Sequence, residues 1–499
     1  MNTVMSYKPL YAVLVSLIGA FFIIFTREKR QNLREAWTFI AAFIKFGIVL
    51  SMLPVILQGK VIKLTLLELA PGLSLMFKVD FFGIIFGLVA SGLWIVTSLY
   101  SIGYMRGLKE HAQNRYFFAF ALCLSATMGI AFSGNLLTFY LFYEMLTIAT
   151  YPLVTHNEDE EAVKAGRKYL TYTLTAGVLL LFAIGATYIY AGTLEFTPGG
   201  FLKGHNIPIG LLQVLLVAYL IGCGVKAGVM PFHAWLPSAM VAPTPVSALL
   251  HAVAVVKAGV FGCVRIIAYV FGPVLLKDIH MWLIVAYFVS FTIIVSSLFA
   301  LASDNLKRRL AFSTISQLSY IILGAALLSN SSLTGSILHI PFHAYMKITL
   351  FFCAGAIFVN TGKKNISELD GIGRQMPFTM GAFTLASFGM VGIPPLCGFI
   401  SKWYLCLGTL QAREVFFLFV LLTSAVLNAA YFFPIVYAAF FRKPATAGAP
   451  SGMAEASLPL VLPLSITVVM AVIFGIFPNF IFHFFDLARS AATSILTGM

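Results

Sequence analysis

Ionisable residues stand inside long apolar stretches of the chain, and five of them are candidates for chemistry. They are Glu144, Lys226, Lys257, Lys347 and Lys402. A charged side chain at the middle of a bilayer costs about 2.5–3.5 kcal/mol on insertion scales, which is more than a packing role justifies. Burial favours the neutral amine, so such a lysine can take up and release a proton near neutral pH. The pattern predicts a row of protonatable sites inside a membrane.

A further group of ionisable residues has helical spacing. In the stretch HIPFHAYMK, His339, His343 and Lys347 follow one another at intervals of four residues. They therefore fall on one face of a helix. Histidine titrates near neutral pH, which suits it to pass protons between neighbouring groups. A polar contact between helices is the alternative explanation of this stripe.

Three more residues are candidates for accessory roles. His251 lies six positions before Lys257, off its helix face, so we expect it to serve a neighbouring helix. Asp304 and Lys307 stand at a helix start in DNLKRRLAFS. They could take up protons there, or they could equally be loop charges that fix the orientation of the helices in the membrane. Arg265 lies toward a helix end, and we expect it to reach for the surface.

Structural explanations remain open for two of the main residues. Lys257 would then bond backbone carbonyls at a kink, and Glu144 would bond a hydroxyl and stay neutral. In the functional interpretation, Glu144 lies near Lys226 and holds it protonated until the two move apart. The sequence alone leaves their contact undecided.

The composition sets the class of protein. Of 499 residues, 60% are hydrophobic and 10% are charged, and the mean hydropathy is +0.95; soluble proteins carry about 25% charged residues. The chain is therefore expected to be a polytopic membrane protein. The net charge of +14 does not indicate nucleic-acid binding, because the basic residues lie in short loops between apolar runs.

Apolar runs of about 20 residues, long enough to cross a bilayer, predict an all-α fold with about 14 transmembrane helices. The expected spans are 9–26, 37–56, 79–103, 116–133, 135–155, 169–191, 207–230, 245–271, 281–302, 306–328, 333–359, 377–408, 414–441 and 458–483. Lysine and arginine are concentrated in every second loop, beginning with REKRQNLRE. This bias places both termini on the outer side.

Glycine and proline interrupt the seventh and the twelfth run. The interruptions are GVKAGVMPFHAWLPSAMVAPTP and GMVGIPPLCGFISKWYL, beside Lys226 and Lys402. Paired breaks indicate an inverted repeat with ion sites at the breaks, and the offset predicts two five-helix repeats, helices 4–8 and 9–13. The predicted divisions are a three-helix segment (1–103), a first repeat (116–271), a second repeat (281–441) and a C-terminal helix and tail (458–499).

We expect no cofactor and no metal in this chain. Its six cysteines, Cys123, Cys223, Cys263, Cys353, Cys397 and Cys406, lie in apolar runs without a CxxC pair, as is typical of small buried residues. GCGVKAG (222–228) resembles part of a dinucleotide loop, but no strand precedes it. Redox chemistry, if the system uses it, is expected in other chains.

Long motifs resemble the antiporter-like subunits shared by respiratory complex I and Mrp-type cation/proton antiporters, with the D-type subunit of Mrp systems the most similar. They are FYLFYEMLTIATYPLV, VKAGVMPFHAWLPSAMVAPTPVSALL, LLHAVAVVKAGVF, DNLKRRLAFSTISQLSY and GIPPLCGFISKWYL, in order within about residues 75–440. The resemblance implies fourteen helices with inverted five-helix repeats.

By motif match the resemblance also implies roles. Glu144 pairs with Lys226, Lys257 is the central lysine, His339, His343 and Lys347 are connecting residues, and Lys402 is the terminal lysine that opens toward the outer side. One main complex I type commonly has glutamate at the position of Lys402, so the lysine here departs from part of the family.

We therefore expect a proton-translocating subunit of a multisubunit complex in a bacterial or archaeal cell membrane. The complex is either an Mrp-type antiporter or a redox-driven assembly, and the sequence leaves open whether Na⁺ moves with the protons. The expected partners are other membrane subunits and lipid. A stand-alone secondary transporter of a small solute and a structural membrane spacer are the alternatives.

Overall fold

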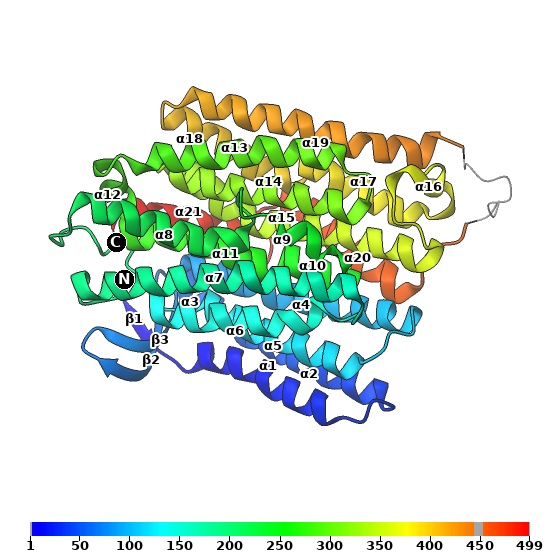
Figure 1. Ribbon diagram of the computed structural model, residues 1–499, viewed down its shortest axis with the longest axis horizontal. Helices are drawn as coiled ribbons and strands as arrows, with labels where there is room; N and C mark the ends of the chain where they lie inside the picture. Colours follow the sequence, from blue (N-terminus) through cyan, green and yellow to red (C-terminus); the bar gives the residue numbers. More distant parts are fainter. Residues whose placement is uncertain (1, 444–452, 499) are drawn as a thin grey trace.

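The fold is a bundle of long helices that run roughly along one axis, with a small sheet at one end (Figure 1). The computed structural model describes residues 2–443 and 453–498. The helices are α1 (Lys8–Phe25), α2 (Gln31–Leu50), α3 (Leu53–Leu57), α4 (Phe81–Gly107), α5 (Gln113–Ala131), α6 (Leu136–Val154), α7 (Glu160–Ala191), α8 (Ile209–Ala227), α9 (Trp235–Ser238), α10 (Thr244–Ala252), α11 (Val255–Arg265), α12 (Gly272–Asp278), α13 (Met281–Ala302), α14 (Leu306–Ala326), α15 (Asn330–Thr361), α16 (Ile372–Gln375), α17 (Pro377–Val391), α18 (Cys397–Gln411), α19 (Val415–Phe441), α20 (Leu458–Ile476) and α21 (Phe484–Thr497). Short 3-10 turns cover Ala239–Val241 and Ile366–Glu368, and a π-helical turn covers Ile266–Phe271.

The predicted helical membrane fold is confirmed, with a small sheet in addition to the helices. Each expected apolar run falls on helix, and eleven helices within the described residues are long and apolar enough to cross a membrane. Helices α5 and α14 are outside that group, since they carry more polar residues; both are almost wholly buried among other helices. The total of fourteen spans stays a prediction.

The N-terminal segment contains a sheet that the apolar runs did not predict. β1 (Thr3–Met5) pairs in parallel with β2 (Val61–Ala70), and β2 pairs in antiparallel fashion with β3 (Leu73–Val79). Glu195 joins the sheet to the rest of the protein, since its carboxylate accepts hydrogen bonds from Lys63 and Lys78 at 3.0–3.2 Å.

Both predicted helix breaks are present. Helix α8 ends at Ala227 and is followed by Gly228 with φ +75°, and α17 ends before Gly392 with φ +100°. These left-handed conformations cost glycine little. The expected single helix 245–271 is wrong, because the chain also breaks at residues 253–254, between α10 and α11. Neither glycine nor proline marks that break, so the sequence pattern did not reveal it.

Two isolated backbone bridges support the predicted repeat. Asn135, which caps the N-terminus of α6, bridges to Glu195, and Asn305, which caps α14, bridges to Asn365. These are matching positions in the two predicted repeats. The first bridge lies at the sheet end of the bundle and the second toward α16 at the opposite end (Figure 1). The division into two inverted repeats stays a prediction.

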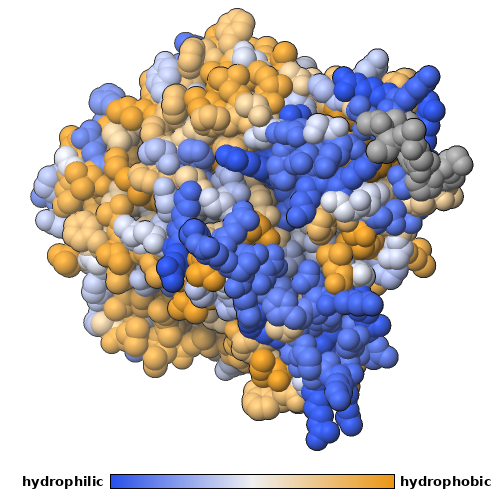
Figure 2. Space-filling view, turned by 45° about the vertical axis from the view of Figure 1, so that its right-hand side comes forward, coloured by the Kyte–Doolittle hydropathy of each residue, from blue (hydrophilic) through white to orange (hydrophobic). Residues whose placement is uncertain are grey.

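The surface has a polar end that is distinct from its apolar flanks. Hydrophilic residues gather at the end near α16, between flanks of apolar side chains (Figure 2). Both ends of the described chain lie at the other end, beside the sheet (Figure 1). Large apolar side chains are exposed on the flanks, among them Ile148, Val178 and Val426. Such a surface suits lipid or other membrane subunits. Which end faces the inner side stays a prediction.

Arg265 does not reach for the surface, contrary to expectation. It is 1% exposed and its two terminal nitrogens bond the carboxylate of Asp80 at 2.5 and 2.9 Å. Asp80 also caps the N-terminus of α4 by accepting from the amide of Gly83 at 2.7 Å. The two short hydrogen bonds to Asp80 stabilise the buried guanidinium, so the side chain does not need to extend to the surface.

Replacing Arg265 by alanine should therefore destabilise the protein strongly. The change leaves the Asp80 carboxylate buried without its cation, which costs about 3–5 kcal/mol. Thermal unfolding in detergent measures the effect. The control is Arg442→Ala, because Arg442 is 59% exposed and lies 3.5 Å from Asp370; an exposed pair is worth about 0–1 kcal/mol. Equal melting temperatures for the two variants would contradict the prediction.

Candidate functional site

Lys226 and Glu144 form an ion pair inside the bundle. Lys226, in the last turn of α8, is fully buried, and its Nζ lies 4.0 Å from Oε1 of Glu144. The same ammonium donates a 2.5 Å hydrogen bond to the carbonyl of Tyr143 and lies 3.2 Å from the centre of that ring. The contact that the sequence left undecided is thus present.

A glycine on the neighbouring helix makes room for this carboxylate. A Cβ atom on Gly177 of α7 would lie 2.5 Å from Oε1 of Glu144. Neither carboxylate oxygen has a hydrogen-bond partner within the described part of the chain. The bond from Glu144 to a hydroxyl, which was the structural alternative, is therefore not observed among these residues. Lys226 is the cation paired with Glu144.

Lys257 contacts a histidine. Its Nζ lies 2.8 Å from Nδ1 of His343 on α15, and both side chains are fully buried. The unpredicted break at residues 253–254 places Lys257 in the first turn of α11, facing α15. The hydrogen-bond partner of Lys257 is thus an imidazole and not the backbone carbonyl of the structural alternative. An amine and an imidazole at this distance can exchange a proton directly.

The predicted stripe lies on one unbroken helix, α15. The rings of His339 and His343 are 5.8 Å apart between centres. His339 Nδ1 lies 2.8 Å from Oγ of Ser401, and its Nε2 lies 3.0 Å from Oε1 of Gln317. His339 thus connects α15 to α14 and to α18, the second half of the broken helix.

Lys347 is directed toward α14. Its Nζ donates to Oγ of Ser313 at 2.9 Å and to the carbonyl of Leu310 at 3.3 Å. Ser313 in turn accepts a hydrogen bond from the hydroxyl of Tyr431 at 3.1 Å. Lys347 is fully buried, so its hydrogen bonds are made to groups of α14 inside the bundle and not at the lipid-facing surface.

Lys402 binds the broken end of α17. Its Nζ donates to the carbonyls of Met390 and Val391, at 2.5 and 3.1 Å. These carbonyls belong to the last turn of the helix, where oxygens lack partners and a cation is favoured. Lys402 is partly exposed and follows Ser401, the partner of His339.

The accessory candidates His251 and Asp304 lie in different environments. His251 is fully buried beside Phe351, and neither ring nitrogen has a hydrogen-bond partner in residues 2–443 and 453–498. Asp304 is exposed and accepts hydrogen bonds from the amide and hydroxyl of Ser367, at 3.1 and 2.8 Å. Asp304 therefore anchors the loop after α15 through hydrogen bonds to Ser367.

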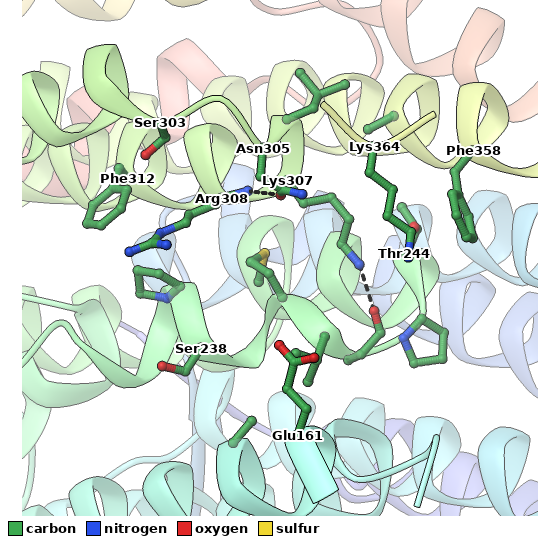
Figure 3. Close-up of a pocket in the computed structure, with 18 of the residues that line it drawn as sticks. Glu161, Ser238, Thr244, Ser303, Asn305, Lys307, Arg308, Phe312, Phe358 and Lys364 are labelled. Carbon is green, nitrogen blue, oxygen red and sulfur yellow. Dashed lines mark hydrogen bonds between the residues drawn. The ribbon is translucent and has the colours of Figure 1, made fainter. Parts of the chain in front are cut away.

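Lys307 borders a hollow of about 1250 Å³. Its Nζ donates to the carbonyl of Ala242 at 2.7 Å. Figure 3 shows Lys307, Glu161 and Lys364 pointing into the hollow from α14, α7 and the loop after α15. Segments from both predicted repeats thus line it, which is why no single stretch of sequence predicted it.

The sequence pattern missed the polar partners of the predicted residues. Gln317 and Ser313 on α14 and Ser401 on α18 have neutral side chains, so they are not visible as intramembrane charges. A signal was available in AFSTISQLSY, which is unusually polar for an apolar run. Polar residues of this kind are enriched where membrane helices contact one another.

Comparison with known proteins gives one family. Residues 133–428 match the family described as NADH:quinone oxidoreductase/Mrp antiporter, transmembrane. NADH-quinone oxidoreductase subunit N of Desulforudis audaxviator is 31% identical over 411 residues, covering 78% of this chain and 81% of that protein. The A-type subunit of the Na⁺/H⁺ antiporter of Alkalihalophilus pseudofirmus is 27% identical over 499 residues, covering 94% of this chain and 61% of that protein.

Two solved structures share the fold. The Mrp complex from a Dietzia species matches with a TM-score of 0.87 and 22% identity, over 98% of this chain and 97% of that one. The membrane-bound sulfane sulfur reductase, an archaeal respiratory complex, matches with a TM-score of 0.88 and 23% identity, over 98% of each chain. The particular similarity to the D-type Mrp protein stays a prediction.

Replacing Gly177 by alanine should stabilise the protein less than alanine normally does inside a helix. Alanine inside a helix normally stabilises it by about 0.5–1 kcal/mol relative to glycine. At position 177 the new methyl group would lie 2.5 Å from Oε1 of Glu144, so the carboxylate must move and its contact with Lys226 is disturbed, which offsets this gain. Gly185→Ala on the same helix is the control, because a Cβ there meets no atom within 4 Å among the described residues. In thermal unfolding, the melting temperature of Gly185→Ala should be higher than that of Gly177→Ala. The reverse order would contradict the prediction.

Proposed function

We propose that this chain, which belongs to the NADH:quinone oxidoreductase/Mrp antiporter transmembrane family, is a proton-translocating subunit of a multisubunit membrane complex. The observation that carries the proposal is the buried 2.8 Å contact between Lys257 and His343. It lies between an ion pair, Glu144 with Lys226, and a terminal lysine, Lys402. A static scaffold has no need for this series of protonatable groups.

Protons enter from the inner side through the hollow beside Lys307. Three observations support this step: the hollow is lined by charged groups, it lies at the end rich in basic loops, and His251 is buried beyond it without a protein partner in the described chain. Buried polar groups of this kind are usually satisfied by water. Water near His251 would connect the hollow to Lys347 and Lys257.

From Lys257 the proton passes to His343 and then along α15 to His339. The two rings are not in hydrogen-bond contact, so water or a ring rotation bridges them. His339 bonds Ser401, which adjoins Lys402. Lys402 is partly exposed, and it releases the proton toward the outer side.

The ion pair controls the proton affinity of the lysines. While Glu144 stays close, its charge favours protonated Lys226. The carboxylate has no other partner among the described residues, so a small displacement of Glu144 releases the lysine to give up its proton. The change in charge then shifts the proton affinity of Lys257 and the groups beyond it.

The partners are other membrane subunits, and the exposed apolar flanks offer them a surface. The solved structures with this fold are named as multisubunit complexes, one a Mrp complex and one a respiratory complex. We propose that this chain binds no redox cofactor and that its driving reaction, a redox step or Na⁺ exchange, takes place in partner subunits. Proton transport by the purified chain alone would instead favour a stand-alone transporter.

Lys226→Ala in the assembled complex should abolish proton translocation. The change removes the cation that Glu144 controls, so we expect at least a tenfold loss of proton uptake in vesicles, with assembly intact. Lys45→Ala is the matched control. Lys45 is also a fully buried lysine, but it bonds the carbonyl of Leu124 at 3.0 Å and lies over the ring of Trp94. Unchanged translocation in Lys226→Ala would make this chain a structural spacer.

Lys257 and His343 should act as one unit in transport. We expect Lys257→Ala and His343→Ala each to lower proton uptake at least tenfold, and the double variant to be no worse than either. Residues in direct contact show such non-additivity, whereas distant residues add. Uptake rates of the wild type, both single variants and the double variant give the coupling. Losses that simply multiply would contradict a direct transfer between the two side chains.

A further inference from the structure

Two loops near the hollow bring a carboxylate and two imidazoles together. Glu110 and His111 lie between α4 and α5, and His156 follows α6. Oε2 of Glu110 is 4.0 Å from Nδ1 of His111 and 4.0 Å from Nε2 of His156. The three ligating atoms lie within 4.8 Å of one another. The imidazole rings are stacked, with centres 4.9 Å apart and an angle of 26° between planes.

His156 is an unusual member of this cluster. It is fully buried, yet neither ring nitrogen has a hydrogen-bond partner in the described chain. Most buried polar side chains are satisfied, so a buried imidazole with two bare nitrogens requires an explanation. A neutral imidazole carries the lone pair that a metal ion binds.

The ligand types select the class of ion. Imidazole nitrogen with one carboxylate suits Zn²⁺ and similar transition-metal ions, whereas Mg²⁺ and Ca²⁺ prefer oxygen ligands. In a tetrahedral site with bonds of about 2.0–2.1 Å, neighbouring ligand atoms are about 3.4 Å apart. The observed separations are larger, so the side chains must close by about 1 Å. His111 is 48% exposed and has the freedom to make that movement.

The local charges permit a cation. A nearby positive group, Arg115, is already paired with Glu158 through one terminal nitrogen, and the other donates to the backbone carbonyl of His156 at 3.1 Å. The carboxylate of Glu110 faces the two histidines. Glu110 also lines the hollow, so an ion between the three side chains would lie at its edge.

We propose that Glu110, His111 and His156 form a binding site for Zn²⁺ or a chemically similar transition-metal ion. The fourth coordination position is open to water. The ion ties the loop before α5 to the loop after α6 at the edge of the hollow. None of the three ligands is a cysteine, so the cysteine pattern gave no sign of a metal site.

The test measures metal content in the purified complex. The protein is treated with a chelator, titrated with Zn²⁺ and desalted, and zinc per complex is determined by mass spectrometry. We expect the wild type to hold one more Zn²⁺ per copy of this chain than His111→Ala or Glu110→Gln. Both changes are at partly exposed side chains, so the fold should survive them. Excess Mg²⁺ should not displace the ion.

The matched control is His483→Ala, because His483 is similarly exposed, at 44%, and lies 3.5 Å from a carboxylate, that of Asp486. It should retain the wild-type zinc content. Equal zinc in the wild type and in His111→Ala would overturn the proposal, as would displacement by Mg²⁺. The readout is metal content rather than transport, so its outcome does not depend on the proposed function.

Discussion

A cation buried in a lipid-embedded protein must have a partner, and the arrangement of this molecule follows from that requirement. Arg265 has a close carboxylate, Asp80, and its charge is fixed. Lys226 has a carboxylate at 4.0 Å, and Lys257 has only an imidazole as its hydrogen-bond partner among the described residues. These looser partners support the proposal that Lys226 and Lys257 change protonation state. The same constraint thus separates structural cations from those suited to carry protons.

The helix breaks supply partners that an intact helix cannot. A helix end leaves carbonyl groups without intrahelical donors. Lys402 uses two such carbonyls, those of Met390 and Val391 at the end of α17. At the end of α8, the carbonyl of Val225 instead accepts the indole N–H of Trp235 at 2.7 Å. At the α17 break the lysine and the freed carbonyls thus compensate one another, whereas at the α8 break Lys226 bonds the carbonyl of Tyr143 on α6.

The hollow lies at one end of the molecule, and the buried ionisable residues lie in the interior of the bundle. Charged groups line the hollow at the end near α16, and Lys307 stands at its edge. Beyond it, His251, Lys347 and Lys257 lie in the dense centre of the bundle, where the packing is between helices. At the opposite end the sheet is joined to the bundle by Glu195. The two ends of the molecule are thus chemically different, as a directional transport route requires.

The sequence by itself determined the membrane class, the apolar runs, the two Gly/Pro breaks and the ionisable residues inside helices. Each of these is a local property, since lipid penalises any charge or open backbone group wherever it occurs. Only the tertiary structure decided which groups touch. Lys257 meets His343, and His339 meets Gln317 and Ser401, across helices far apart in the chain. The break after α10, the hollow and the cluster around His156 also depend on packing between segments, which no local pattern records.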